Sequence, residues 1–176
     1  NPKAKGQSSA ELQGSKFSAE ARWVSTWRRT LPLGICLCAL TFRLPAAEFT
    51  PGKTYFGRNN YIEYLAGDLP FVLSAPHGGR EKPPELPDRK EGVFAFDTNT
   101  QELARAIAAE FRARTGRSPH VIICRLDRQK IDCNRDVGEG AQSNALTGVA
   151  WTNFQDFIAA AKTTVSNRFG RGFYID

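Results

Sequence analysis

One of the two histidines in this chain of 176 residues stands where a histidine can do chemistry. His77 lies in the run Ser74-Ala75-Pro76-His77-Gly78-Gly79, directly after an apolar, strand-like segment. Two glycines at that place allow a ligand or a metal ion to come close to the backbone. The imidazole can ligate a metal or transfer a proton, or it can be a loop histidine bonded to a carbonyl. His120 begins an apolar run after Pro119, and we expect it to be structural.

Asp97 is the second candidate, because it stands at the start of the clearest helical pattern in the chain. Asp97 or Thr98 can cap that helix by accepting backbone hydrogen bonds, which explains the residue without any chemistry. A carboxylate at a helix start can equally face a metal ion held by a neighbouring loop. The second interpretation requires His77 to lie close by.

A third candidate is the run Arg128-Gln129-Lys130-Ile131-Asp132-Cys133-Asn134-Arg135. Arginine binds a carboxylate through two parallel hydrogen bonds, and an aspartate between two arginines can orient both. The run therefore suits recognition of an acidic substrate group by Arg128, Asp132, Asn134 and Arg135. A solvated ion-pair cluster is the alternative explanation. A phosphate-binding loop is not supported, because the required glycines and the Lys followed by Ser or Thr are missing.

These candidates follow or begin regular elements. We expect strands at 61–65, 71–74, 120–126 and 173–176, and the first two could form a hairpin or two adjacent strands. Helical spacing predicts helices at 97–116 and 151–167, whereas the segment from 75 to 93 and residues 134–148 are expected to be loops. The apolar stripes of the two helices are Leu103, Ala104, Ile107, Ala108 and Phe111, and Phe154, Phe157, Ile158, Ala161 and Val165.

The alternation of strands and helices predicts an α/β fold with a mixed, mostly parallel sheet flanked by helices. The run 120–126 is apolar at nearly every position, which is typical of a strand buried on both faces. Ligand-binding loops leave such a sheet at the carboxyl ends of its strands. Because the pattern stops on a strand, we expect the domain to be incomplete at its C-terminal side.

Charge is distributed unevenly along the chain, whose formal net charge is +6. Residues 1–47 hold seven basic and two acidic residues, a net of +5, which leaves 17 minus 16, or +1, for residues 48–176. A surplus confined to one end does not make a basic binding face, so we expect no nucleic-acid partner.

Residues 1–47 are expected to be a disordered basic extension that contains a signal-peptide-like segment at about 28–47. Arg28 and Arg29 precede an apolar run from 31 to 42, and small residues follow it. This order is that of an export signal, and the alternative is a buried helix or strand. The run is too short for a stable membrane span. The protein is thus expected to be exported if the segment is used, and cytoplasmic otherwise.

Two of the four cysteines, Cys124 and Cys133, lie outside the signal-like segment. A disulfide between them in an oxidising compartment and a pair of buried free thiols are both compatible with the sequence. Zinc held by cysteines is not expected, because no second close pair of cysteines or histidines exists.

Taken together, the Pro76-His77-Gly78-Gly79 loop, the helix opening at Asp97, and the run from Arg128 to Arg135 resemble the N-formylglutamate amidohydrolase family. The resemblance covers roughly residues 60–176, and the Arg-x-x-x-Asp-x-Asn-Arg run is its most specific part. It implies a phosphorylase/hydrolase-like architecture, similar to zinc carboxypeptidases and peptidoglycan amidases, with one hydrolytic zinc ion (Zn2+). Residues 48–176 would then be the N-terminal part of an amidohydrolase-like domain.

By this resemblance His77 and Asp97 look like zinc ligands, while Arg128, Asp132, Asn134 and Arg135 look like the substrate-side cluster. A third ligand and the general base are expected beyond residue 176, and no catalytic base is assigned here. The implied partner is a small acidic amide or peptide substrate. An exported peptidoglycan or peptide amidase and a non-catalytic carboxylate-binding module are the alternatives, and salt-sensitive nucleic-acid binding by residues 48–176 is a third.

Overall fold

The computed structural model describes residues 49–95 and 97–176, so the basic extension and signal-like segment expected over residues 1–47 lie outside the described residues. Within those ranges, no helix is both long and apolar enough to cross a membrane.

A five-stranded sheet forms the centre of the described part, in the order β1-β2-β4-β3-β5. Strand β3 is parallel to both β4 and β5, whereas β2 is antiparallel to β1 and to β4. The predicted α/β class with a mixed sheet is therefore confirmed. The strands are β1 (Thr54–Phe56), β2 (Ile62–Leu65), β3 (Phe71–Ala75), β4 (His120–Cys124) and β5 (Phe173–Ile175).

Strand β4 is buried at all five positions, as its apolar sequence predicts. The expectation that residues 61–65 and 71–74 form a hairpin or adjacent strands was wrong, because β4 lies between β2 and β3. The connection between β2 and β3 packs against the residues just before β4. Asp68 N donates to Ser118 O at 2.9 Å, and a Cβ on Gly67 would lie 2.3 Å from the Pro119 carbonyl carbon. The glycine permits this close backbone approach, and the contact helps to position β4 between β2 and β3.

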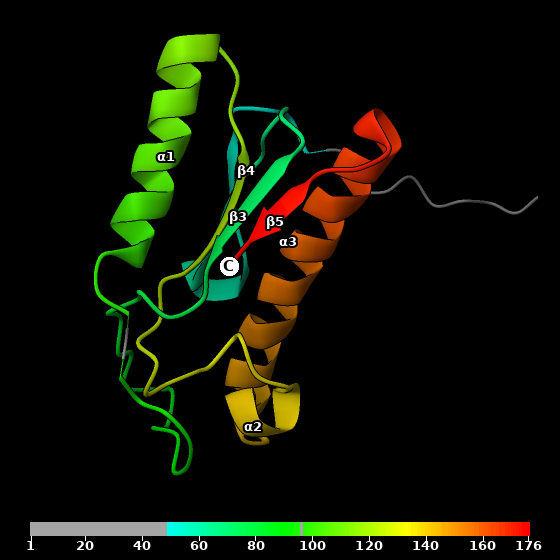
Figure 1. Cartoon of the computed structure of the whole chain (residues 1–176). Coiled ribbons are helices and arrows are strands. Elements are labelled where there is room, and N and C mark those ends of the chain that lie inside the picture. Colours follow the sequence, from blue (N-terminus) through cyan, green and yellow to red (C-terminus); the bar gives the residue numbers. More distant parts are fainter. Residues whose placement is uncertain (1–48, 96) are drawn as a thin grey trace, which may run out of the picture. The chain divides into compact units, whose positions relative to one another are not determined.

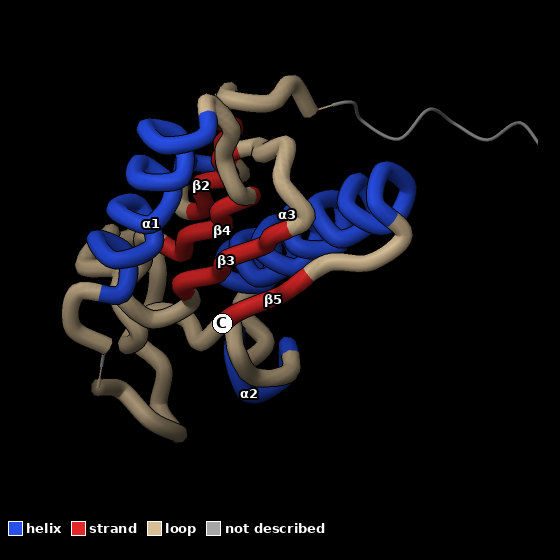
Figure 2. Tube along the Cα trace, turned by 45° about the horizontal axis from the view of Figure 1, so that its top comes forward, coloured by secondary structure: helices blue, strands red, loops and turns tan. Residues whose placement is uncertain are grey.

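Helices α1 (Thr100–Thr115) and α3 (Ala145–Phe169) cover opposite faces of the sheet (Figures 1 and 2). Ala104 and Ala108 of α1 pack with Val121 and Ile123 of β4. The larger cluster on the other face contains four buried residues of the stripe predicted for the second helix, namely Phe154, Ile158, Ala161 and Val165.

Helix α3 begins at Ala145, within a segment expected to be a loop. Asn144 explains this start, because its side-chain oxygen accepts hydrogen bonds from the backbone N–H groups of Leu146 and Thr147. The same segment also contains the short helix α2 (Val137–Ala141), capped by Asp136.

Candidate functional site

The carboxyl ends of β3 and β4 lie next to each other because the two strands are parallel neighbours. The loop after β3 carries His77, and the loop after β4 carries Arg128 and Asp132. Isolated bridges join Gly79 to Asp127 and Glu81 to Leu126, so the two loops run side by side. Both lie at the end of the sheet near α2 (Figure 1).

His77 lies between two carboxylates. Its Nε2 atom is 2.7 Å from Asp132 Oδ1, and its Nδ1 atom is 3.2 Å from Asp97 Oδ2. A carboxylate can only accept a hydrogen bond, so the 2.7 Å contact requires Nε2 to carry a proton. A neutral imidazole then presents the lone pair of Nδ1 to an oxygen of Asp97. Two acceptors at this distance repel each other unless a proton or a metal ion lies between them.

Asp97 does not cap the following helix, contrary to the simpler of the two expectations. Helix α1 begins at Thr100, and the N-cap position is occupied by Asn99 in a left-handed conformation, with no side-chain capping hydrogen bond. The Asp97 carboxylate faces His77 instead, and 53% of its side chain is exposed. The structure therefore brings together the two residues that the sequence suggested as metal ligands, with one of them open to solvent.

Asp132 is completely buried beneath His77. Oδ1 binds His77 and also accepts the backbone N–H of Asn134 at 3.0 Å, and Oδ2 accepts from Arg128 Nε at 2.9 Å. Burial by itself would raise the pKa of Asp132, but the hydrogen bonds from His77 and Arg128 hold it well below its usual range. The carboxylate is thus ionised, and it faces the protein interior.

Arg128 is buried as well, and its guanidinium connects the two carboxylates. Arg128 bonds to Asp132, and its Nη1 atom donates to Ala95 O at 3.2 Å and lies 3.9 Å from Asp97 Oδ1. The four residues predicted for the substrate side are therefore divided. Arg128 and Asp132 support His77 from below, whereas Asn134 and Arg135 are exposed. Arg135 makes a loose ion pair with Glu139 at 3.6 Å.

Arg89 is a buried residue of the site that sequence reasoning missed. Its Nη1 atom lies 3.9 Å from Asp132 Oδ2 and donates to the carbonyls of Val93 and Arg128, and its Nη2 atom donates to the carbonyl of Glu91. Arg89 thus fixes the long loop after β3 against the loop after β4. Its partners are mostly backbone carbonyls, which leave no pattern in the sequence.

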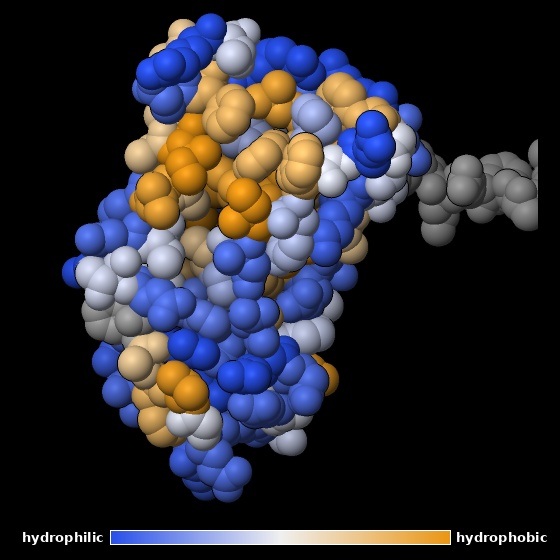
Figure 3. All heavy atoms as spheres, in the orientation of Figure 1, coloured by the Kyte–Doolittle hydropathy of each residue, from blue (hydrophilic) through white to orange (hydrophobic). Residues whose placement is uncertain are grey.

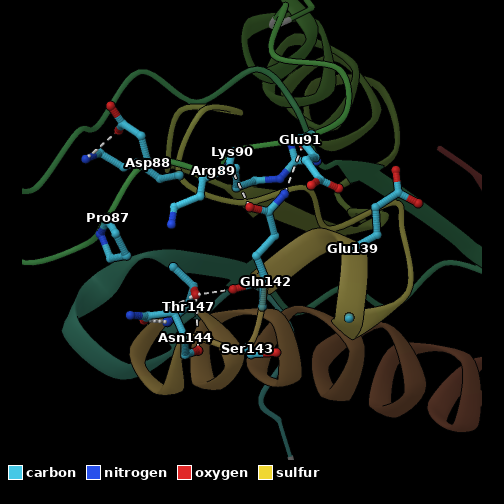
Figure 4. A pocket seen from close by; sticks show the side chains of 13 residues that line it. Pro87, Asp88, Arg89, Lys90, Glu91, Glu139, Gln142, Ser143, Asn144 and Thr147 are labelled. Carbon is cyan, nitrogen blue, oxygen red and sulfur yellow. Dashed lines mark hydrogen bonds and ion pairs between the residues drawn. The ribbon is translucent and has the colours of Figure 1, made fainter.

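A polar pocket of about 630 Å³ lies beside this loop, between residues 87–91 and the corner that joins α2 to α3 (Figure 4). Gln142 connects the two sides of the pocket, because its Oε1 accepts a hydrogen bond from Lys90 N and its Nε2 donates one to Glu91 O. Lys130, in the loop after β4, places its Nζ atom 2.8 Å from Asp88 Oδ1. These contacts stabilise the loop that passes Arg89 and leads towards Asp97.

His77 and Asp97 are suitable in kind for a metal ion, since imidazole and carboxylate are ordinary zinc ligands. In the ranges 49–95 and 97–176, no group of three or more His, Cys, Asp or Glu side chains is arranged to hold a metal. The described residues thus supply two ligand side chains at this place.

Comparison with protein-family models, with curated proteins and with solved structures found no match for this chain.

Proposed function

We propose that the chain belongs to a zinc-dependent hydrolase of linear amide bonds, similar to N-formylglutamate amidohydrolases. The reaction would convert N-formyl-L-glutamate and water into formate and L-glutamate, or would cleave a related N-acyl amino acid. For the fold we propose the phosphorylase/hydrolase-like form of the α/β class. The observation that carries the proposal is the contact between His77 Nδ1 and the Asp97 carboxylate.

The spacing of these two groups suits a shared metal ion. With metal–ligand distances of about 2.1 Å, two ligands of a tetrahedral zinc ion are about 3.4 Å apart. The His77 Nδ1 and Asp97 Oδ2 atoms are 3.2 Å apart, which is near that value. A bound cation would also remove the repulsion between the two facing acceptors.

The residues beneath His77 are those that a metal-binding histidine needs. A histidine that ligates a metal usually donates its other ring N–H to a carboxylate, which fixes the tautomer and the ring orientation. Asp132 accepts that hydrogen bond from Nε2, and Arg128 keeps Asp132 ionised. We assign Asp132 and Arg128 to positioning His77, because neither is open to substrate.

A zinc ion bound at His77 and Asp97 would make a coordinated water acidic enough to attack an amide carbonyl near neutral pH. The chain itself would orient the substrate. Arg135 and Asn134 are exposed and follow directly after the residues that hold His77. Among the described residues, the guanidinium of Arg135 has one ion-pair contact, at 3.6 Å with Glu139, so it can turn to the acidic group of a substrate.

The experiment is a titration of the metal-free chain with Zn2+, with formate release from N-formyl-L-glutamate assayed on the full-length protein. We expect one zinc site that requires both His77 and Asp97, with His77→Ala and Asp97→Asn each lowering the zinc affinity at least tenfold. Asp156→Asn is the matched control, because Asp156 is exposed on α3. Zinc binding that is equally strong without His77 would contradict the proposal.

A further inference from the structure

Two buried thiols lie together directly beneath the site. Cys124 is the last residue of β4, and Cys133 follows Asp132 in the chain. Both belong to the same core cluster, with 0% and 2% of their surfaces exposed. The Cys124 thiol is near enough to contribute to the raised pKa of Cys133, and both thiols are free in the structure.

The two cysteines flank the segment that supports His77. Residues 125–132 leave β4 at Cys124, carry Arg128 and Asp132, and return to Cys133. The carbonyl of Cys133 also accepts a hydrogen bond from Gln155 Nε2 at 2.8 Å, which fixes that end of the segment to α3. A covalent bond between the thiols would therefore close the loop at its base.

We propose that Cys124 and Cys133 form a disulfide when the chain folds in the presence of a small-molecule disulfide such as oxidised glutathione. Neighbouring thiols in one core cluster need only a small approach to reach the S–S bonding distance of about 2.05 Å. One thiolate attacks the oxidant and forms a mixed disulfide, and the second thiolate then displaces the small thiol. In total the two cysteines lose two protons and two electrons, and the oxidant is reduced to two thiols.

The bond forms during folding because the native thiols are shielded. Burial raises the pKa of Cys133, with the Cys124 thiol beside it as a further cause, so the reactive thiolate is rare in the folded chain. The same shielding protects the disulfide from reductants once it has formed. The bond is therefore a stable brace for the loop that carries Asp132, and it is independent of any bound metal.

The test uses the whole chain with Cys36→Ser and Cys38→Ser, which leaves one cysteine pair. The protein is refolded with reduced and oxidised glutathione, alkylated without reduction, and digested with trypsin. We expect peptides 118–125 and 131–135 to be found joined, and to separate after reduction. The oxidised protein should also melt at a higher temperature than the reduced protein, because the cross-link restricts the unfolded chain.

Cys133→Ala in the same background is the control, in which neither the joined peptides nor the oxidant-dependent rise in melting temperature should occur. The same mapping is done on the protein isolated from an oxidising compartment, which does not depend on refolding. The proposal is overturned if Cys124 and Cys133 are both recovered alkylated, or if either carries glutathione, in folded protein from both sources.

Discussion

At the scale of single residues, the site depends on buried charges of opposite sign that compensate one another. The ionised carboxylate of Asp132 is buried, and the positive charges of Arg128 and Arg89 lie 2.9 Å and 3.9 Å from it. Removing one partner of such a buried group is costly because the other charges are left uncompensated. His77 in turn depends on Asp132 for its orientation.

Asp132→Asn is therefore expected to lower the free energy of unfolding by about 3 kcal/mol, measured by urea denaturation at pH 7. The zinc affinity should fall together with the stability. The lowered pKa of Asp132 means that its stabilisation is present above the ordinary pKa of aspartate and is lost as the pH falls below it. The variant should lack this part of the acid sensitivity. A variant as stable as the parent protein would show that the buried charges do not depend on one another.

His120 gives a second prediction at this scale. Its Nδ1 accepts from Gly67 N and contacts Tyr64 Oη at 2.8 Å, and among the described residues its Nε2 has no hydrogen-bond partner. Burial lowers the pKa of His120 to about 4, from 6.5 in a free histidine. The unfolded chain thus binds a proton first as the pH falls, and stability is lost between pH 6.5 and 4.

We expect this group to cost about 3 kcal/mol of stability across that range, since each pKa unit corresponds to about 1.4 kcal/mol. The measurement is urea denaturation at pH 7, 5.5 and 4.5, for the parent chain and for His120→Gln. The variant should be less stable at pH 7 but should depend less on pH. An equal loss of stability with falling pH in both proteins would rule out His120 as the cause.

At the scale of elements, two asparagines stand at helix starts and make different contributions. Asn144 caps α3 through two backbone N–H groups, whereas Asn99 precedes α1 with a φ of 65° and makes no capping bond. Asn144→Ala should destabilise the protein by about 1 kcal/mol. Asn99→Gly should be neutral or slightly stabilising, because glycine adopts a positive φ without strain. Thermal unfolding of both variants checks the contrast, and equal losses would contradict it.

The elements that the sequence predicted well were those with a long apolar pattern. Strand β4 and most of α3 follow from their buried residues, and α1 ends at Thr115, close to the predicted end at 116, with Gly116 in a left-handed conformation. Strand β1 has three residues and α2 has five, so neither shows a detectable period. The insertion of β4 between β2 and β3 depends on tertiary contacts at Gly67, which no local pattern encodes.

The candidate site was predictable in its residue types and only partly in its arrangement. His77 and Asp97 stood out through a glycine-rich loop and a helix start. The inward position of Asp132 depends on its contact with His77, 55 positions away, and Arg89 joins the two loops through the carbonyl of Arg128, 39 positions away.

At the scale of the whole molecule, polar and apolar groups are separated over the visible surface. Hydrophobic side chains gather between α1 and β5, whereas the end that carries the site loops is mostly hydrophilic, with a smaller hydrophobic group at its edge (Figure 3). Exposed hydrophobic residues of these two elements include Phe173 and Ile175 of β5 and Leu103 of α1, with 71%, 53% and 60% of their surfaces exposed. Phe71 of β3 contacts both α1 and β5, since its ring centroid lies 5.9 Å from those of Phe111 and Phe173. The proposed acidic substrate would bind at this polar end, away from the apolar region.

The most direct test of the account is the zinc titration of the metal-free chain by calorimetry. We predict one site, whose affinity falls at least tenfold in His77→Ala and in Asp97→Asn and is unchanged in Asp156→Asn. If the parent chain takes up no zinc, or if His77→Ala and Asp97→Asn bind it as tightly as the parent does, the assignment of His77 and Asp97 as metal ligands is contradicted.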